Sequence, residues 1–474
     1  MKIIGRIEEQ EKIKKVLMSN HAEFVVVYGR RRIGKTYLIK EYFSDIFSFY
    51  TSGVLSKKSS DELKAFNQSL INYGCKEIKV PKNWFEAFNR LKTMLDNNII
   101  KIDSRYNKRV IFFDELPWFD TLRSDFKGAF DFFWNTYASR LNDLVLIVCG
   151  SSTSWILNNL INDKGGFHNR ITSKIHLKPF NLNEVEQLVN NLNGNKLSKD
   201  DILKLYMVFG GVPYYLNFIN PNFSIIQNID NLLFKEGGEL EHEFNNLFSS
   251  LFMRYENYAR VIDVLSKKKK GLTRNEILYI TKLTSGYSFT KILLELVECG
   301  FIREYADYKK NKNNTLYQII DPFVLFALNF LKDKKFNLWM NFVGQPGYYS
   351  WCEYAFEVVC LNHIGQIKKS LGIEGIDSIN YAFSTNKEGG AQIDLLIDRK
   401  DNIINLCEMK YTVEPFTIDK HYEENLINKI RVFKEVTKTN KAIVVTLISF
   451  NGVNKNQYYN IVRKEVNAID LFKD

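Results

Sequence analysis

Residues 24–36, FVVVYGRRRIGKT, constrain the fold more than any other part of this chain. The first five of them are apolar and rich in β-branched side chains, which is typical of a buried strand. The next eight have the spacing G-x-x-x-x-G-K-[ST] of a phosphate-binding loop, whose backbone N–H groups surround the phosphates. The stretch therefore predicts a buried strand, a loop that binds a nucleoside triphosphate and a helix whose positive end lies beneath the phosphates.

Each residue type in this loop has an expected task. Lys35 reaches the β- and γ-phosphates, and the Thr36 hydroxyl ligates Mg²⁺. The three consecutive arginines are not needed for phosphate binding and could face a neighbouring subunit, the C-terminal region or DNA. The predicted nucleotide-binding residues in this stretch are Gly29, Arg30, Arg31, Arg32, Ile33, Gly34, Lys35, Thr36 and Tyr37.

Composition limits the class of protein without choosing a function. A length of 474 residues indicates about three domains, and 45% hydrophobic residues are enough for packed cores. The six cysteines are scattered without a C-x-x-C pair, which favours buried thiols in a reducing cytoplasm. No apolar run approaches membrane-spanning length, so we expect a cytoplasmic protein without a membrane partner. The net charge of +11 fits either an anionic partner such as nucleic acid or a lysine-rich surface that only aids solubility.

Two further apolar runs end in polar residues. Residues 110–113 lead into Asp114 and Glu115, and residues 144–149 lead toward Ser151. Ligands bind at the carboxyl ends of the strands in open α/β sheets. We expect Asp114 to hold Mg²⁺ through water, Glu115 to polarise the attacking water and Ser151 to sense the γ-phosphate. The alternative for the serines is a turn that caps the following helix.

Several ordered motifs resemble those of the AAA+ family, in its archaeal-type ATPase branch. These are GRIEEQ, YGRRRIGKT, VIFFDELPW, VCGSS, HNRI, LKPFNLNE and FGGVPYYL. The resemblance implies that Arg6 lies near the adenine, that Ser151 is sensor 1 and that Arg170 is an arginine finger for a neighbouring subunit. Such a finger requires a homo-oligomer. Residues 209–216 contain no arginine, so the lid-borne second sensor of the wider family has no counterpart there.

Residues 254–330 are predicted to form three helices followed by a hairpin, the order of a winged helix-turn-helix. Its hairpin tip carries Lys309, Lys310 and Lys312, which suit phosphate contacts. The third helix has few basic groups beyond Lys291, so DNA binding here would not be sequence-specific. The module could equally serve only to pack against protein.

The C-terminal region contains two strand-like runs, residues 391–397 and 403–411, which carry Asp394, Glu408 and Lys410. A hairpin would place Asp394 opposite Cys407 or Glu408. A charge in an apolar strand is costly unless it is paired or bound to metal. Two carboxylates suit Mg²⁺, and a nearby lysine can stabilise a phosphate. The alternative is a structural salt bridge among these residues.

This acid-acid-lysine set resembles the PD-(D/E)XK nucleases, although Ile393 stands where that motif has proline. The resemblance implies that Glu357, on the preceding helix, completes a metal site with Asp394 and Glu408. Lys429, on the following helix, would add a phosphate contact.

The sequence thus predicts an α/β architecture: a P-loop parallel sheet with a helical lid, then a winged-helix module and an α/β restriction-endonuclease-like domain. The expected bounds are residues 1–180 for the AAA+ core, 181–250 for the lid, 251–335 for the winged helix and 340–474 for the nuclease-like domain. ATP and Mg²⁺ are the expected cofactors, and we expect ATP hydrolysis to gate or drive DNA cleavage in defence against mobile DNA. The alternatives are a regulatory ATPase switch that binds nucleic acid or protein without cleavage, and a protein-assembly scaffold.

Overall fold

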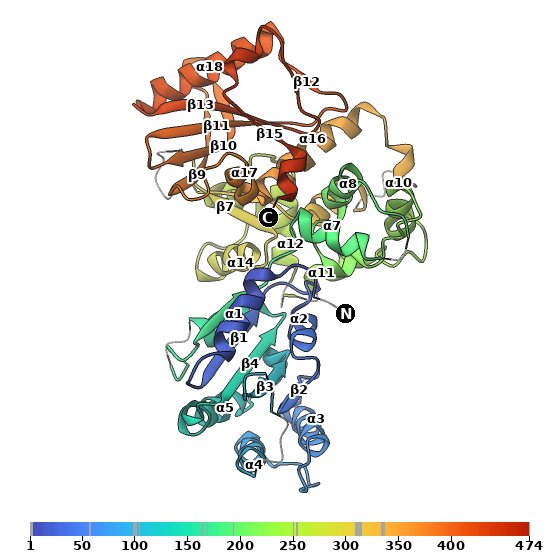
Figure 1. Ribbon diagram of the computed structural model, residues 1–474, viewed down its shortest axis with the longest axis vertical. Coiled ribbons are helices and arrows are strands. Elements are labelled where there is room, and N and C mark those ends of the chain that lie inside the picture. Colours follow the sequence, from blue (N-terminus) through green and yellow to red (C-terminus); the bar gives the residue numbers. More distant parts are fainter. Residues whose placement is uncertain are drawn as a thin grey trace. The chain divides into compact units, whose positions relative to one another are not determined.

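The computed structural model describes residues 3–473 except 56–57, 98–101, 104, 163–164, 168, 193, 250, 253–254, 309–314 and 333–336. The hairpin lysines Lys309, Lys310 and Lys312 therefore lie outside the described residues, as does His168 of the HNRI motif. The chain divides into two compact units, Met1–Lys178 and Pro179–Asp474 (Figure 1). Within the described residues, no helix has both the length and the apolar character that crossing a membrane requires.

The first unit is built on a five-stranded parallel sheet with the strand order β2-β3-β4-β1-β5. Burial on both faces explains why its central strands are almost continuously apolar in sequence. The bounds are β1 Glu23–Tyr28, β2 Phe49–Ser52, β3 Arg109–Asp114, β4 Leu144–Gly150 and β5 Ser173–His176.

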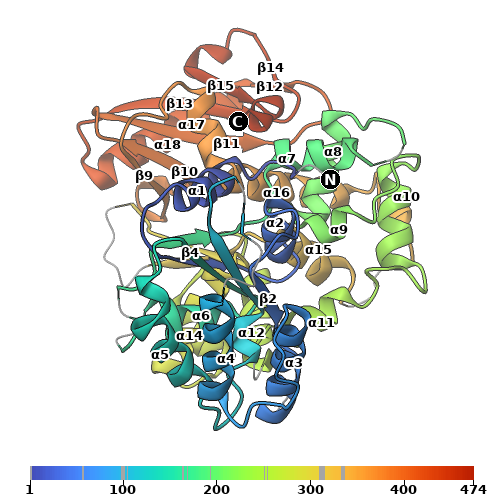
Figure 2. The same ribbon diagram turned by 60° about the horizontal axis from the view of Figure 1, so that its bottom comes forward.

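Helices cover both faces of this sheet (Figure 2). Alternate residues of one strand serve opposite layers: Val25 and Val27 pack with α1 and α2, whereas Phe24 and Val26 pack with α3, α4 and α5. The latter layer is rich in aromatic rings, which accounts for much of the phenylalanine content. The helices are α1 Ile7–Leu17, α2 Lys35–Tyr42, α3 Ser59–Asn72, α4 Trp84–Asp96, α5 Phe126–Thr136 and the short α6 Thr153–Ile156.

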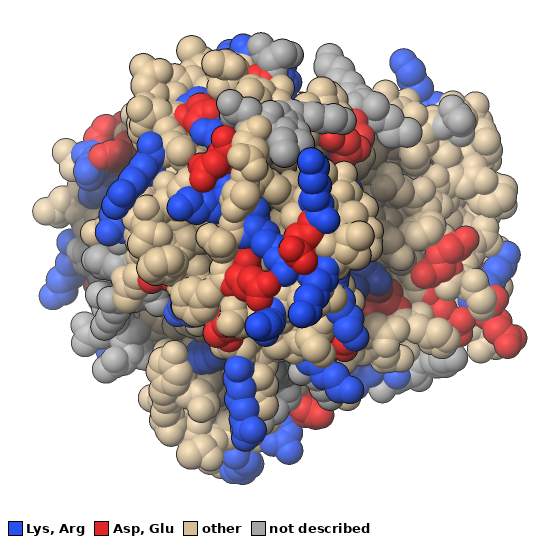
Figure 3. All heavy atoms as spheres, turned by 90° about the horizontal axis from the view of Figure 1, so that it is seen from below, with Lys and Arg blue, Asp and Glu red and all other residues tan. Residues whose placement is uncertain are grey.

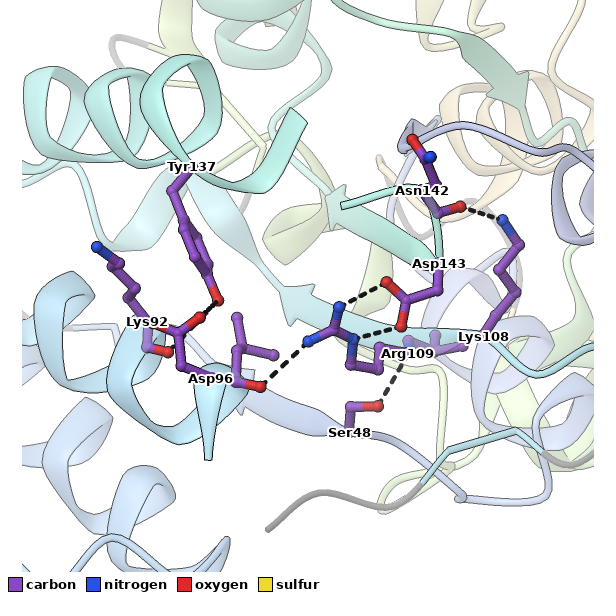
Figure 4. A network of polar contacts seen from close by, with 10 residues as sticks. Ser48, Lys92, Asp96, Lys108, Arg109, Tyr137, Asn142 and Asp143 are labelled. Carbon is purple, nitrogen blue, oxygen red and sulfur yellow. Dashed lines mark hydrogen bonds and ion pairs between the residues drawn. The ribbon is translucent and has the colours of Figure 1, made fainter. Parts of the chain in front are cut away.

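A network of polar contacts connects the residues at which β3 and β4 begin (Figure 4). Arg109 donates two hydrogen bonds to the Asp143 carboxylate, at 2.6 and 2.5 Å, and a third to the carbonyl of Leu95 at the end of α4. Lys108 donates to the Asn142 carbonyl at 2.6 Å. This paired arginine fixes the starts of the two strands whose opposite ends carry the candidate site.

The second unit begins with a helical segment in which backbones approach very closely. The Phe180 N–H donates to the carbonyl of Gly211 at 2.6 Å, and a Cβ on Gly211 would lie 1.8 Å from the Phe180 carbonyl oxygen. The glycine of FGGVPYYL is therefore required by this contact. The helices are α7 Leu182–Asn190, α8 Lys199–Phe209, α9 Pro213–Leu216, α10 Ile225–Ile229 and α11 Glu243–Ser249.

The next elements occur in the order that the sequence predicts for the middle region: α12 Tyr255–Ser266, α13 Arg274–Thr281, α14 Tyr287–Glu298 and the antiparallel strands β7 Ile302–Tyr305 and β8 Leu316–Ile319. The expected capping box at the start of α13 is present, because Thr273 and Glu276 each bond the other's backbone. A short strand, β6 Leu272–Thr273, also pairs with β8, and α15 Pro322–Phe330 follows.

The C-terminal region contains a second five-stranded sheet with the order β15-β13-β11-β10-β9. The three strands β9, β10 and β11 form an antiparallel meander, and α18 then crosses over to β13, which is parallel to β11 (Figure 1). Val432 and Phe433 of α18 pack on this sheet. The bounds are α16 Pro346–Asn362, α17 Ile364–Ser370, β9 Ser378–Thr385, β10 Ala391–Arg399, β11 Ile403–Lys410, α18 Lys420–Thr437, β13 Ala442–Ser449 and β15 Lys464–Asn467.

The hairpin β7–β8 is joined to this sheet through the residues that follow β7. The Ala382 N–H of β9 donates to the Ala306 carbonyl at 3.2 Å, and the Tyr308 N–H donates to the Ala382 carbonyl at 2.9 Å. The Tyr308 ring is buried against Tyr381 and Phe433. The hairpin is thus packed on protein at the end where β7 leads into its connecting loop.

Candidate functional site

The phosphate-binding loop lies between β1 and α2, as the sequence predicts. Gly29 and Gly34 have φ angles of 137° and 87°, and a Cβ on Gly29 would lie 2.3 Å from the Leu177 carbonyl oxygen. Lys35 is buried, and its Nζ donates to the carbonyls of Gly29 and Arg30 at 2.9 and 2.8 Å. The lysine therefore lies over its own loop, where it can meet a phosphate.

Asp114, at the end of β3, is the centre of a hydrogen-bond network beside this loop. Its Oδ1 accepts hydrogen bonds from the Thr36 hydroxyl at 2.9 Å, from the Glu115 N–H at 3.0 Å and from the Cys149 thiol at 2.7 Å. Burial, followed by the charge of Asp114, raises the pKa of Cys149 well above its usual value, so this thiol stays protonated and acts as a donor. The ends of β3 and β4 and the start of α2 thus converge on one carboxylate.

Glu115 is held beside this carboxylate by the next strand. Its Oε2 accepts hydrogen bonds from the Ser151 N–H at 2.9 Å and from the Ser151 hydroxyl at 2.8 Å. Glu115 itself has φ 48°, in the left-handed region that non-glycine residues rarely adopt. Such strain clusters at functional sites, where the surrounding structure imposes it. Ser151, which we expected to sense the γ-phosphate, therefore also holds in place the carboxylate of Glu115, which we expected to polarise the attacking water.

A buried acid near this site was not identified from the sequence. Glu62 of α3 has no exposed surface, and its carboxylate accepts hydrogen bonds from the Val54 N–H at 3.2 and 3.1 Å. Burial raises its pKa to about 7. The residue before Val54, Gly53, packs against the Glu115 carbonyl, so Glu62 supports the backbone beside the acid pair. The only sequence signal is an acid next to the apolar residue Leu63.

The remaining predicted nucleotide-binding residues have different environments. Arg6 is buried and donates to the carbonyls of Lys178 at 2.7 Å and Ile33 at 3.2 Å, so it ties the start of the chain to the loop. The three loop arginines are not equivalent: Arg30 is 1% exposed, Arg31 is exposed and Arg32 is half-buried. Tyr37 and Arg170 are exposed, the latter in the loop before β5.

The second set of predicted site residues lies on β10, β11 and α16. Leu395 pairs with Cys407 across the two strands, and this register brings Asp394 to the level of Glu408. Glu408 is buried, and its Oε1 accepts from Lys429 of α18 at 2.6 Å. Burial raises the pKa of Glu408, and the Lys429 charge opposes that rise. The sequence had suggested Lys429 only as a phosphate contact.

Lys410 is directed to a different acid from those that we predicted. Its Nζ lies 3.2 Å from Oε1 of Glu353, one turn before Glu357 on α16. Glu357 is half-buried, and burial together with the Asp394 charge raises its pKa to about 8. The nearby guanidinium of Arg303, on the hairpin β7–β8, acts in the opposite direction. Neither Glu353 nor Arg303 carried a sequence signal.

The two sites differ in how well they fit a divalent cation. At the loop, the Thr36 and Asp114 oxygens lie 2.9 Å apart and are the ligand type that Mg²⁺ prefers. At the second site, Glu408 forms an ion pair with Lys429. No group of three or more His, Cys, Asp or Glu side chains is assembled for metal binding anywhere in the part of the chain that the structure describes. The expected ligands Glu357, Asp394 and Glu408 therefore do not form a metal centre in this arrangement.

The distribution of charged side chains on one face of the molecule is relevant to the expected binding of DNA. On the face that Figure 3 shows, lysine and arginine side chains are interspersed with aspartate and glutamate. The excess of basic residues in the sequence does not form one continuous basic surface there. That face therefore has no simple electrostatic footprint for nucleic acid.

Comparison with known proteins identifies the part of the chain that holds the first site. An uncharacterised protein of Methanocaldococcus jannaschii is 24% identical over 336 residues, which are 69% of this chain and 68% of that protein. Two solved structures are similar at lower identity. The Walker-type ATPase of Pyrococcus abyssi is 17% identical, covering 69% of this chain and 96% of that one, with a TM-score of 0.48. The ORC2 protein of Aeropyrum pernix is 12% identical, covering 70% and 95%, with a TM-score of 0.44.

One family model matches the chain, over residues 4–219, and it describes an ATPase domain predominantly from Archaea. The matched residues include the phosphate-binding loop, Asp114, Glu115 and Ser151. Residues 4–219 thus match the model of an archaeal-type ATPase domain.

Proposed function

We propose that this chain binds ATP with Mg²⁺ at the loop between β1 and α2 and hydrolyses it. The observation that carries the proposal is the hydrogen-bonded set of Thr36, Asp114, Glu115 and Ser151, beside Lys35 at the carboxyl edge of a parallel sheet. Thr36 and Asp114 would hold Mg²⁺, which neutralises phosphate charge when it is bound.

The side chains of this set have separate tasks in the proposed reaction. Lys35 would leave the two loop carbonyls and bind the β- and γ-phosphates, while the loop amides surround them. Glu115 would accept the proton of the attacking water or orient it, and Ser151 keeps its carboxylate in place. Hydrolysis of this kind depends on positioning and electrostatic stabilisation rather than on covalent chemistry.

The test is ATP turnover by the full chain with Mg²⁺. Lys35→Ala should abolish ATP binding, whereas Glu115→Gln should retain binding and lower the turnover rate by about 10²-fold or more, the range for losing a general base. Lys40→Ala is the matched control, because Lys40 lies on the same helix and contacts the Tyr50 ring. Full turnover by the Glu115→Gln variant would contradict the assigned role.

As a second function we propose that the C-terminal region acts on DNA as a nuclease. Support comes from its sheet, in which an antiparallel meander is followed by a crossover helix and a parallel strand, and from the acids on that sheet. Asp394 lies at the level of Glu408, and its charge acts on Glu357. The alternative is a regulatory ATPase whose C-terminal region only binds nucleic acid or protein. The role that we propose for cleavage is defence against mobile DNA, because one basic chain would carry two phosphate-chemistry sites.

Plasmid nicking in the presence of Mg²⁺ and ATP separates these alternatives. We expect the wild-type chain to nick the plasmid and Lys410→Ala to lose this activity, while the exposed Lys400→Ala control retains it. A wild-type chain that hydrolyses ATP without nicking, and that retains DNA after Glu408→Ala, would instead be the regulatory switch.

A further inference from the structure

A small cavity lies where the hairpin β7–β8 meets β9 and β10. Its lining includes Arg303 and Gln318 from the hairpin, Glu357 from α16 and Asp394 from β10. Its volume of about 10 Å³ is the space that one water molecule needs. Glu357 and Asp394 therefore share one small cavity with Arg303.

The hairpin holds a positive charge in the wall of this cavity. Nε of Arg303 donates to Oε1 of Gln318 at 2.8 Å, and the guanidinium carbon lies 4.3 Å from the centre of the Tyr305 ring. Gln318 is 1% exposed, and its amide donates to the Lys269 carbonyl at 2.6 Å. These contacts come from the hairpin and the turn before it, so the guanidinium position is set independently of the acids that it faces.

The third acid has a cation of its own. Nζ of Lys429 lies 2.6 Å from Glu408, whose second oxygen is 3.4 Å from the Tyr422 hydroxyl. Glu408 and Lys429 are 8% and 18% exposed in their side chains, so the pair is shielded from water and from salt. Two cations from separate elements thus lie beside the three acids that were expected to bind metal. Arg303 of the hairpin lines the same cavity as Glu357 and Asp394, and Lys429 of α18 forms an ion pair with Glu408.

We propose that Arg303 and Lys429 are internal counter-ions, which stand in the place of a divalent cation among Glu357, Asp394 and Glu408. The proposal rests on the second proposed function and deepens it, because it states how that site is regulated. A divalent cation binds these acids only in competition with the two resident charges. Removing either cation leaves these carboxylates with less compensating charge, although Lys269 still acts on Glu357 and Lys410 on Glu408, and this favours a metal ion.

The test is a calorimetric titration of the nucleotide-free full chain with Mn²⁺. Arg303→Gln and Lys429→Gln should each bind Mn²⁺ at least tenfold more tightly than the wild type, because each removes a competing charge from a low-dielectric site. Arg303→Lys and Lys429→Arg keep the charge and should match the wild type. Adding Asp394→Asn to either glutamine variant should abolish the gain.

Unchanged Mn²⁺ affinity in the folded glutamine variants would overturn the proposal, as would a gain that survives Asp394→Asn, or no saturable Mn²⁺ binding in any variant. If thermal unfolding shows that Arg303→Gln does not fold, Lys429→Gln decides alone, since Lys429 reaches Glu408 from a partly exposed position on α18. Mn²⁺ affinity is read without DNA, whereas the nuclease proposal fails through the absence of nicking. The two failures are therefore distinguishable.

Discussion

Glu62 shows how one residue outside every motif can affect the ATPase domain. Its carboxyl group is fully buried on α3 and supports the Val54 backbone, beside the segment that packs on Glu115. A pKa of about 7, against 4.5 for the ordinary side chain, means that the folded protein binds this proton more tightly than the unfolded chain does. The stabilising effect is complete below pH 4.5 and is lost as the pH rises through 7.

We therefore predict that Glu62→Gln removes a pH dependence of stability. Between pH 5 and pH 7.5 the free energy of unfolding of the wild type should fall by up to about 3 kcal/mol more than that of the variant, from 1.36 kcal/mol for each pKa unit. Urea unfolding at the two pH values measures this difference. The exposed Glu77→Gln is the control and should keep the wild-type slope. Equal slopes for the wild type and Glu62→Gln would contradict the assignment.

Residues in contiguous motifs could be placed from the sequence, whereas contacts between distant residues could not. The positions of Lys35, Thr36 and Asp114 follow from a loop spacing and from the end of an apolar run. The hydrogen bonds of Ser151 to Glu115 and the ion pair of Lys429 with Glu408 depend on side-chain packing between separate elements. No local pattern encodes such packing, and charged residues such as Arg303 look like ordinary surface residues in the sequence.

At the scale of elements, local periodicity predicted helices and strands well. The helices α12, α13 and α14 and the strands β10 and β11 occur where the sequence indicates them. These elements are specified by side-chain spacing and capping within a few residues. The roles of the winged-helix and nuclease-like modules remain predictions.

Local periodicity does not determine how elements that are distant in the sequence pair with one another. The register between β9 and β10 shifts between Ile393 and Leu396, next to Asp394. Such an irregularity redirects side chains and cannot be seen in an alternating pattern. The attachment of the hairpin β7–β8 to β9 through Ala306 and Tyr308 was likewise unexpected. It favours the packing interpretation of this hairpin at the end where β7 leads into the connecting loop.

At the scale of the whole molecule, the proposed arginine finger makes a prediction about assembly. Arg170 is exposed, so it is available to a second copy of the chain. Arg170→Ala should lower ATP turnover by about 10³-fold while nucleotide affinity stays unchanged. Turnover per chain in the wild type should rise with protein concentration, because a neighbour completes each site.

Mixing two inactive variants tests this assembly directly. Lys35→Ala cannot bind ATP but still carries Arg170, so adding it to Arg170→Ala should restore part of the turnover. Arg140→Ala removes another exposed arginine of the same unit and should behave as the wild type. Normal turnover in Arg170→Ala alone, or failure of the mixture to recover any activity, would contradict this role.

The backbone contacts of Ala306 and Tyr308 have a consequence for the integrity of the C-terminal sheet. Strand β9 lies at one edge of this sheet, and an edge strand offers unpaired amide and carbonyl groups to other chains. The segment after β7 occupies both groups of Ala382. The expected boundary near residue 340 therefore does not separate the hydrogen bonds of the hairpin from those of the C-terminal sheet. A fragment cut there would expose the outer strand and become prone to aggregation.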